Sequence, residues 1–192
     1  HLPNAIASGC IVNYGGKHIV LTVSHATKKP GNWAMEIGYE QGKGTHLYGL
    51  GQMNFLARTT LGETKLKNID FSYVEIPDSI IPLRQEINIY QEILTEEQII
   101  IHQLPFDVMP KKGITYGFSG SVMPNIEKHP GVTFSNTELQ ICTDLEYVRS
   151  CDDYHCFKLP AKHPGHMYFE GCSGSPVIAE DGTTIVGLVC GG

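Results

Sequence analysis

Short apolar or alternating segments recur along this chain, and turn residues separate them. In the first half they cover residues 9–14, 18–24, 33–39, 46–53, 71–76 and 87–90, and in the second half residues 114–118, 133–142, 156–159, 175–178 and 184–190. Strand-length runs between glycine- and proline-containing turns are typical of all-β sandwiches and barrels. The pattern therefore predicts an all-β fold.

Local signals refine this prediction. Gly15 and Gly16 separate two predicted strands, and glycine tolerates the positive φ of a tight hairpin turn. Residues 95–98, Thr-Glu-Glu-Gln, resemble the capping box that starts a helix, but the β-branched residues 99–101 argue against a long one. Residues 77–113 have weaker periodicity, and we interpret this region as a crossing between two β units.

Composition and charge exclude several classes of protein. The chain has 192 residues, of which 41% are hydrophobic, enough for one sizeable domain or two small barrels packed as one unit. The formal net charge of −6 lacks the basic excess of nucleic-acid binders. The longest apolar runs, such as residues 185–190, are far shorter than the ~20 residues of a transmembrane helix. We therefore expect neither a nucleic-acid partner nor a membrane.

Six cysteines lie at positions 10, 142, 151, 156, 172 and 190. An even number would suit three disulfides in a secreted protein, but the spacing does not resemble a dense disulfide framework. Cys10 and Cys190 fall inside apolar runs, where a free thiol behaves as a small hydrophobic side chain. We favour mostly reduced cysteines and a cytoplasmic location, with secretion as the alternative.

A serine flanked by glycines lies in residues 170–177, Glu-Gly-Cys-Ser-Gly-Ser-Pro-Val. Glycines let a backbone approach a substrate carbonyl and direct successive N–H groups at one point. The string resembles the nucleophile motif Gly-x-Ser-Gly-Ser/Gly-Pro of the chymotrypsin-like serine peptidases, and most closely the bacterial glutamyl-endopeptidase and trypsin-like branch. The resemblance implies that Ser173 is the nucleophile and that the amides of Gly171 and Ser173 form the oxyanion hole.

Two further segments resemble the same family. Residues 19–26, Ile-Val-Leu-Thr-Val-Ser-His-Ala, are similar to its strand that ends in Thr-Ala-Ala-His, which implies that His25 is the general base. Residues 68–77 are similar to its Asp-Ile-Ala-x-Leu element, which implies that Asp70 orients the imidazole. His25, Asp70 and Ser173 occur in the family's order. Each signal is weak alone, but together they favour a catalytic triad.

The resemblance also implies an architecture. We expect a single peptidase domain made of two packed antiparallel six-stranded-type β-barrels, at residues 1–85 and 113–192, with a crossing segment at 86–112. In the family another strand and a helix follow the equivalent of Gly192, so we expect an incomplete second barrel and a longer parent chain. By the same resemblance, the substrate-binding residues are Met167, Tyr168, Val189, Cys190, Gly191 and Gly192. His163 and His166 lie near the pocket base, either as selectors of an acidic side chain or as plain loop residues.

Departures from the family qualify these expectations. Ala26 stands where the disulfide partner of Cys10 would be, and Cys172 replaces the aspartate that binds the new N-terminus in trypsin-like zymogens. We therefore expect control by a regulatory protein, an attached domain or a loop. Cys172 is an alternative nucleophile, but the positions of Gly171 and Gly174 favour Ser173.

We predict a serine endopeptidase that acts on protein or peptide substrates without metal or cofactor. The alternative is a catalytically silent module of the same fold that binds a protein partner. A third possibility is a zinc-stabilised domain that uses the ligand types in Cys142, Cys151, His155 and Cys156, although no tight Cys-x-x-Cys spacing is present.

Overall fold

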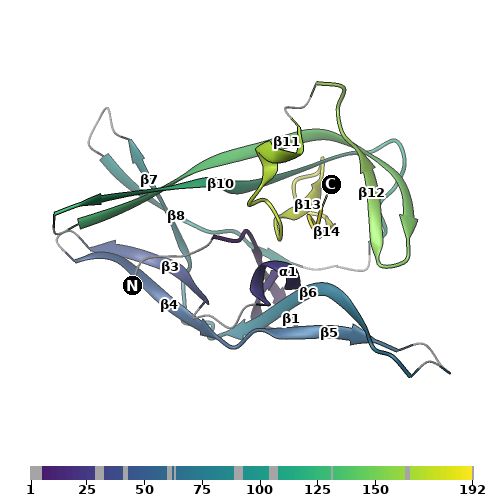
Figure 1. Ribbon diagram of the computed structural model, residues 1–192, viewed down its shortest axis with the longest axis horizontal. Coiled ribbons are helices and arrows are strands. Elements are labelled where there is room, and N and C mark those ends of the chain that lie inside the picture. Colours follow the sequence, from purple (N-terminus) through teal and green to yellow (C-terminus); the bar gives the residue numbers. More distant parts are fainter. Residues whose placement is uncertain are drawn as a thin grey trace.

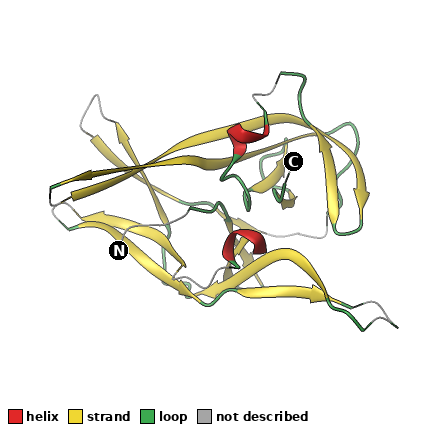
Figure 2. Cartoon of the chain, in the orientation of Figure 1, coloured by secondary structure: helices red, strands yellow, loops and turns green. Residues whose placement is uncertain are grey.

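The computed structural model describes residues 6–28, 33–40, 43–59, 62, 64–88, 93–103, 108–130, 132–162 and 165–191. Strands dominate these residues, and the helical segments among them are the single turns α1 (Ser24–Thr27) and η1 (His166–Phe169) (Figure 2). The prediction of an all-β fold is confirmed.

The strands are labelled in chain order (Figure 1). Those of the first half are β1 (Cys10–Tyr14), β2 (Lys17–Thr22), β3 (Trp33–Glu40), β4 (Gly44–Gly51), β5 (Asn54–Arg58) and β6 (Lys67–Ile76). Next come β7 (Leu83–Asn88), β8 (Ile93–Gln98) and β9 (Ile101–Gln103). The second half contains β10 (Thr115–His129), β11 (Val132–Cys151), β12 (Tyr154–Lys158), β13 (Pro176–Ala179) and β14 (Ile185–Leu188).

Two five-stranded sheets form the framework. Their strand orders are β5-β6-β2-β1-β9 and β12-β11-β10-β13-β14, and β3-β4 and β7-β8 are separate hairpins. In the described part of the chain neither five-stranded sheet closes on itself. What the structure establishes is thus an all-β protein with two main sheets, one from each half.

The predicted crossing segment at residues 86–112 contains regular strand structure. Residues 95–98, where the sequence suggested the start of a helix, lie in β8 and pair with β7. β9 then returns to the first sheet and pairs in parallel with β1. Pairing with a neighbouring strand, which the local sequence does not show, overrides the capping-box signal here.

The hairpin of β10 and β11 is much longer than the apolar pattern predicted. The two strands have 15 and 20 residues and form the long green ribbon pair in Figure 1. Residues 119–131, Ser-Gly-Ser-Val-Met-Pro-Asn-Ile-Glu-Lys-His-Pro-Gly, interrupt hydrophobic alternation. Antiparallel backbone pairing nevertheless continues through most of this stretch, with one register shift between Val122 and Asn125.

The predicted hairpin turn is confirmed at Gly15 and Gly16. Their φ values are +60° and +80°, which side chains with a Cβ rarely adopt. The amide of Gly16 also donates a hydrogen bond of 3.1 Å to Oδ1 of Asn13. The turn therefore fixes the β1–β2 register, in which Tyr14 faces Lys17.

An apolar cluster joins the two halves. It contains Cys10 and Val12 of β1 and Ile185 of β14, all buried, with Leu21 and Leu188 packed against them. Cys10 and Val12 lie two residues apart and so share one face of β1. Burial of this face against β14 holds the end of β2 close to the segments that surround β13 and β14.

A charged cluster makes a second connection between the halves. Nη1 of Arg58 in β5 lies 2.6 Å from Oδ1 of Asp153 in the β11–β12 turn. Nζ of Lys67 in β6 lies 3.3 Å from Asp152 and 3.4 Å from Asp153. Arg58 and Lys67 face each other in the β5–β6 ladder, where like charges repel. The two aspartates of the second half offset this repulsion.

Asp153→Asn is expected to lower the free energy of unfolding by about 1 kcal/mol at low salt, and by less at high salt. The Asp153 side chain is only 13% exposed, so solvent screens its pair with Arg58 weakly. Urea unfolding at two salt concentrations measures the change. Glu75→Gln is the control, because the Lys17–Glu75 pair is more than half exposed on both sides and should contribute little. Equal effects of the two substitutions would contradict the prediction.

Candidate active site

His25 lies on the short α1 turn that follows β2. The sequence predicted strand structure up to Ser24, but β2 ends at Thr22. Oγ of Ser24 and the backbone N–H of His25 both donate to Oδ1 of Asp70, each at 2.9 Å. Because Asp70 belongs to β6, the neighbour of β2 in the sheet, its carboxylate anchors the turn that carries the imidazole.

The imidazole of His25 and the carboxylate of Asp70 form a close pair. Nδ1 of His25 lies 2.7 Å from Oδ2 of Asp70. The β2–β6 register places Thr22 opposite Ser72, and Oγ1 of Thr27 lies 2.8 Å from Oγ of Ser72. The β2–β6 pairing therefore fixes the chain just before His25, and the buried contact between Thr27 and Ser72 fixes it just after His25.

The environment of Asp70 favours its charged form. Burial by itself would raise the pKa of this carboxyl, but hydrogen bonds from the His25 side chain, the His25 backbone and Ser24 together lower its pKa. An ionised Asp70 keeps a proton on Nδ1 of His25, so Nε2 of the neutral imidazole is left as the basic nitrogen. The His25 side chain is 43% exposed, which leaves the ring accessible.

Ser173 lies in a tight loop between η1 and β13. The amide of Cys172 donates to the carbonyl of Phe169, and the amide of Ser175 donates to the carbonyl of Cys172, both at 2.9 Å. Gly171 and Gly174 have φ values of +108° and +96°. A Cβ on Gly171 would also lie only 2.7 Å from the carbonyl oxygen of Ser121. The backbone conformation of the loop therefore favours glycine at both positions, and at Gly171 the close approach of Ser121 leaves no room for a side chain.

The amides of Gly171 and Ser173 are available as donors. Within the described part of the chain neither of them donates a backbone hydrogen bond. The thiol of Cys172 between them is fully buried, and burial, followed by the nearby Cys142 thiol, raises its pKa. A buried thiol with a raised pKa is a poor nucleophile, whereas Ser173 is partly exposed. The geometry thus favours Ser173 over Cys172 as the reactive group.

The Ser173 loop packs against the strand that leads to His25. The α-carbon of Gly174 faces the carbonyl oxygen of Ser8 and Oγ1 of Thr22 so closely that no Cβ fits there. Among the described residues, however, Ser173 Oγ forms no hydrogen bond. The structure therefore joins His25 to Asp70 and brings the Ser173 loop beside β2, without a hydrogen bond between His25 and Ser173.

The segment after β14 is hydrogen-bonded to the Ser173 loop. Val189, Cys190 and Gly191 were predicted to lie on a strand, but β14 ends at Leu188. The backbone of Val189 is instead hydrogen-bonded to the Ser173 loop. Its amide donates to the Ser175 carbonyl at 2.8 Å, and its carbonyl accepts from the Gly174 amide at 2.7 Å. Burial, then the Asp70 carboxylate and the Cys156 thiol, raise the pKa of Cys190. Gly192 lies outside the described residues.

The other predicted pocket residues lie in η1, directly before the Ser173 loop. Met167 is 75% exposed and Tyr168 is 45% exposed. His163 lies outside the described residues, and the backbone of His166 begins η1. The tertiary structure also adds Ser24 and Ser8, which the motifs missed. In the sequence, the only indication that Ser24 belongs to the site is that it directly precedes His25.

The possible zinc ligands do not come together. All six cysteines are free. Cys151 and Cys156 face Tyr154 and Arg149 in the β11–β12 hairpin, and Nδ1 of His155 lies 2.8 Å from Oγ of Ser150. Across the described ranges, three or more His, Cys, Asp or Glu side chains do not gather in a way that would hold a metal ion.

Comparisons with known proteins leave the site to be judged on its geometry. The chain matches no family model, no curated protein and no solved structure. In the part of the chain that the structure describes, no helix has the length and apolar character needed to span a membrane.

Proposed function

We propose that this protein is a serine endopeptidase that hydrolyses protein or peptide substrates through an acyl-enzyme on Ser173. The observation that carries the proposal is the 2.7 Å contact between His25 Nδ1 and Asp70 Oδ2, next to a glycine-flanked loop that presents a partly exposed serine. The proposal gives these groups the roles of a Ser-His-Asp triad, and they follow one another in the sequence as His25, Asp70 and Ser173. Under this proposal the two sheets belong to two chymotrypsin-like β-barrels.

The chemistry follows from the arrangement of the groups. Oγ of Ser173 attacks the substrate carbonyl while Nε2 of His25 takes its proton, and Asp70 stabilises the imidazolium that forms. The amides of Gly171 and Ser173 donate to the oxyanion. His25 then returns the proton to the leaving amine, and a water molecule releases the acyl group by the reverse sequence. The side chains of this chain supply each proton transfer, so the proposed reaction uses no cofactor.

Substrate binding is assigned to the segments on either side of the loop. The backbone after β14, at Val189, Cys190 and Gly191, is proposed to pair with an extended peptide, since Val189 is hydrogen-bonded to the loop that carries Ser173. Met167 and Tyr168 are proposed to line the primary pocket. The six free cysteines support a reducing compartment as the place of action.

A fluorophosphonate probe tests the proposal, because it labels only an activated serine. The wild-type protein is expected to be labelled, and Ser173→Ala is expected to lose all labelling with an unchanged circular dichroism spectrum. Ser175→Ala is a matched control in the same loop: its hydroxyl is buried and has no hydrogen-bond partner in the described structure. Labelling that persists in Ser173→Ala would refute the assignment of the nucleophile.

The alternative function is a catalytically silent module that binds a protein partner. The observation that favours it is that Ser173 Oγ has no hydrogen bond to His25 in the described structure. Catalytic hydrogen bonds are often long before substrate binds, and this is why the peptidase is preferred. A wild-type protein that is folded but never labelled would support the silent module instead.

A further inference from the structure

Ser8, in the segment before β1, connects the two halves at the nucleophile loop. Its Oγ donates a hydrogen bond of 2.7 Å to the carbonyl oxygen of Gly171, which is 163 residues away in the sequence. Its own carbonyl oxygen accepts a hydrogen bond of 2.7 Å from Oγ1 of Thr22. One residue thus bonds both to the proposed oxyanion loop and to the strand that precedes His25.

Glycines make this close approach possible. The α-carbon of Gly174 faces the carbonyl oxygen of Ser8, and a Cβ on Gly120 of β10 would lie 2.8 Å from Oγ of Ser8. A Cβ on Gly9 would lie 2.7 Å from the carbonyl oxygen of Leu21. The backbone around Ser8 therefore fits between the two halves only because side chains are missing at three neighbouring positions.

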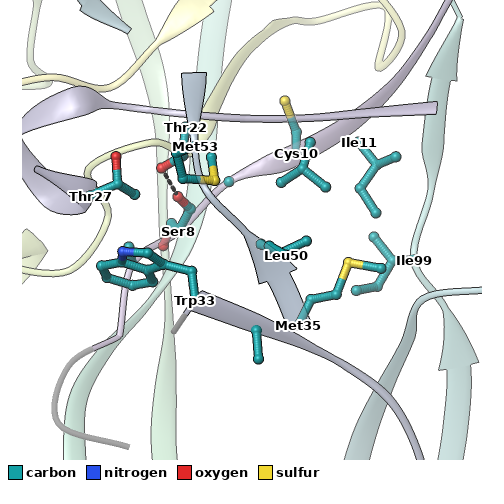
Figure 3. Close-up of a pocket in the computed structure, with 14 residues that line it drawn as sticks. Ser8, Cys10, Ile11, Thr22, Thr27, Trp33, Met35, Leu50, Met53 and Ile99 are labelled. Atoms are coloured by element: carbon teal, nitrogen blue, oxygen red, sulfur yellow. Dashed lines mark hydrogen bonds between the residues drawn. The ribbon is translucent and has the colours of Figure 1, made fainter. Parts of the chain in front are cut away.

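Ser8 borders a cavity on one side. A cavity of about 240 Å³ borders Ser8 and Thr22, and apolar side chains such as Leu50 and Met53 line much of it (Figure 3). Figure 3 shows the hydrogen bond between Ser8 and Thr22 at the edge of this space. The hydrogen bond to the Gly171 carbonyl directs the Ser8 hydroxyl, and the hydrogen bond from Thr22 holds the Ser8 carbonyl.

The bond to Gly171 affects a flexible point of the loop. Gly171 has a φ of +108°, and glycine has more accessible backbone conformations than any other residue. A hydrogen bond on its carbonyl removes rotations of the peptide between Gly171 and Cys172, and so holds the backbone that carries the Gly171 and Ser173 amides. Preorganised donors stabilise an oxyanion because they need no rearrangement during the reaction.

We propose that Ser8 is a positioning residue that holds the Gly171–Ser173 backbone in the form that binds the oxyanion. The inference rests on the proposed peptidase function and extends it. Ser8 does this from the segment before β1, through the 2.7 Å hydrogen bond of its Oγ to the Gly171 carbonyl. Order in that segment thereby controls the order of the active site.

Ser8→Ala tests the proposal with a chromogenic peptide substrate. The value of kcat is expected to fall by about tenfold to one hundredfold while KM changes by less than about twofold, because the oxyanion develops only after the substrate binds. Ser175→Ala is the matched control, since its side chain also lies against Gly120 but has no hydrogen bond to lose. A Ser8→Ala enzyme with unchanged kcat would overturn the proposal.

Two further measurements cover the other outcomes. If Ser8→Ala does not fold, Thr22→Val takes its place. This substitution removes the hydroxyl that holds the Ser8 carbonyl, with little change of volume, and should also lower kcat. Amide NMR reports on the loop without turnover: the Gly171 and Ser173 signals should shift or broaden in Ser8→Ala and remain in place in Ser175→Ala. A wild-type protein that no fluorophosphonate labels refutes the peptidase, whereas unmoved loop signals refute the role of Ser8.

Discussion

Asp70→Asn is expected to lower kcat by about 10,000-fold while KM and the fold stay nearly unchanged. The carboxylate accepts from Nδ1 of His25 at 2.7 Å and so keeps Nε2 free as the base. An asparagine has nearly the same shape, but its amide group can instead donate to Nδ1 and place the imidazole proton on Nε2. It also cannot stabilise the imidazolium. Steady-state kinetics on a peptide substrate, with circular dichroism of the variant, measure the effect.

Ser24→Ala is the matched control for this prediction. It removes one of the hydrogen bonds to Oδ1 of Asp70, but leaves the contact between Oδ2 and His25 in place. The loss in kcat should therefore be at most about one hundredfold, the range of a single hydrogen bond to a charged group. If Asp70→Asn and Ser24→Ala had similar small effects, the carboxylate would not act on His25 as proposed.

Gly174→Ala is expected to lower the free energy of unfolding by about 3 kcal/mol or more. Its φ of +96° is unfavourable for alanine, and the new Cβ would collide with the carbonyl oxygen of Ser8 and with Oγ1 of Thr22. The Ser8 oxygen belongs to the backbone, so the collision can be relieved only by moving the Ser173 loop and the Ser8 segment apart. Urea unfolding followed by circular dichroism measures the loss.

Gly15→Ala separates the contact from the backbone strain. Gly15 also has a positive φ, +60°, but a Cβ there would meet no atom within 4 Å. Its cost should be about 1 to 2 kcal/mol, from the left-handed conformation alone. Both substitutions change the unfolded chain alike, so their difference reports the packing of the two halves at Gly174. Equal losses would mean that the Ser173 loop does not lie against Ser8 and Thr22.

The elements that could be predicted are those with local causes. Residues 9–14 and 18–22 contain short apolar runs and flank two glycines, so the β1–β2 hairpin followed from neighbours in the sequence. The length of β10 and β11 could not be predicted, since their polar residues are paired by backbone hydrogen bonds. β9 could not be placed either, because its partner β1 lies about ninety residues earlier in the chain.

The candidate site divides in the same way. The motifs named His25, Asp70 and Ser173, because catalysis of this kind needs particular side chains next to particular glycines. Their arrangement depended on the pairing of β2 with β6, which brings Asp70 to His25, and on the packing of Gly174 against Thr22. The motifs alone could not decide these long-range contacts.

By itself the sequence determined the all-β class, the Gly15-Gly16 turn and which side chains are candidates for the proposed acyl-transfer site. These follow from strand periodicity, glycine's conformational range and the nucleophilic, basic and acidic groups present. Only the tertiary structure decided that Cys172 is buried beside a partly exposed Ser173, and that Ser8 reaches Gly171. Burial of Cys172 and a hydrogen bond between residues 163 positions apart arise only when the two halves pack together. The conformational preferences of neighbouring residues do not encode that packing.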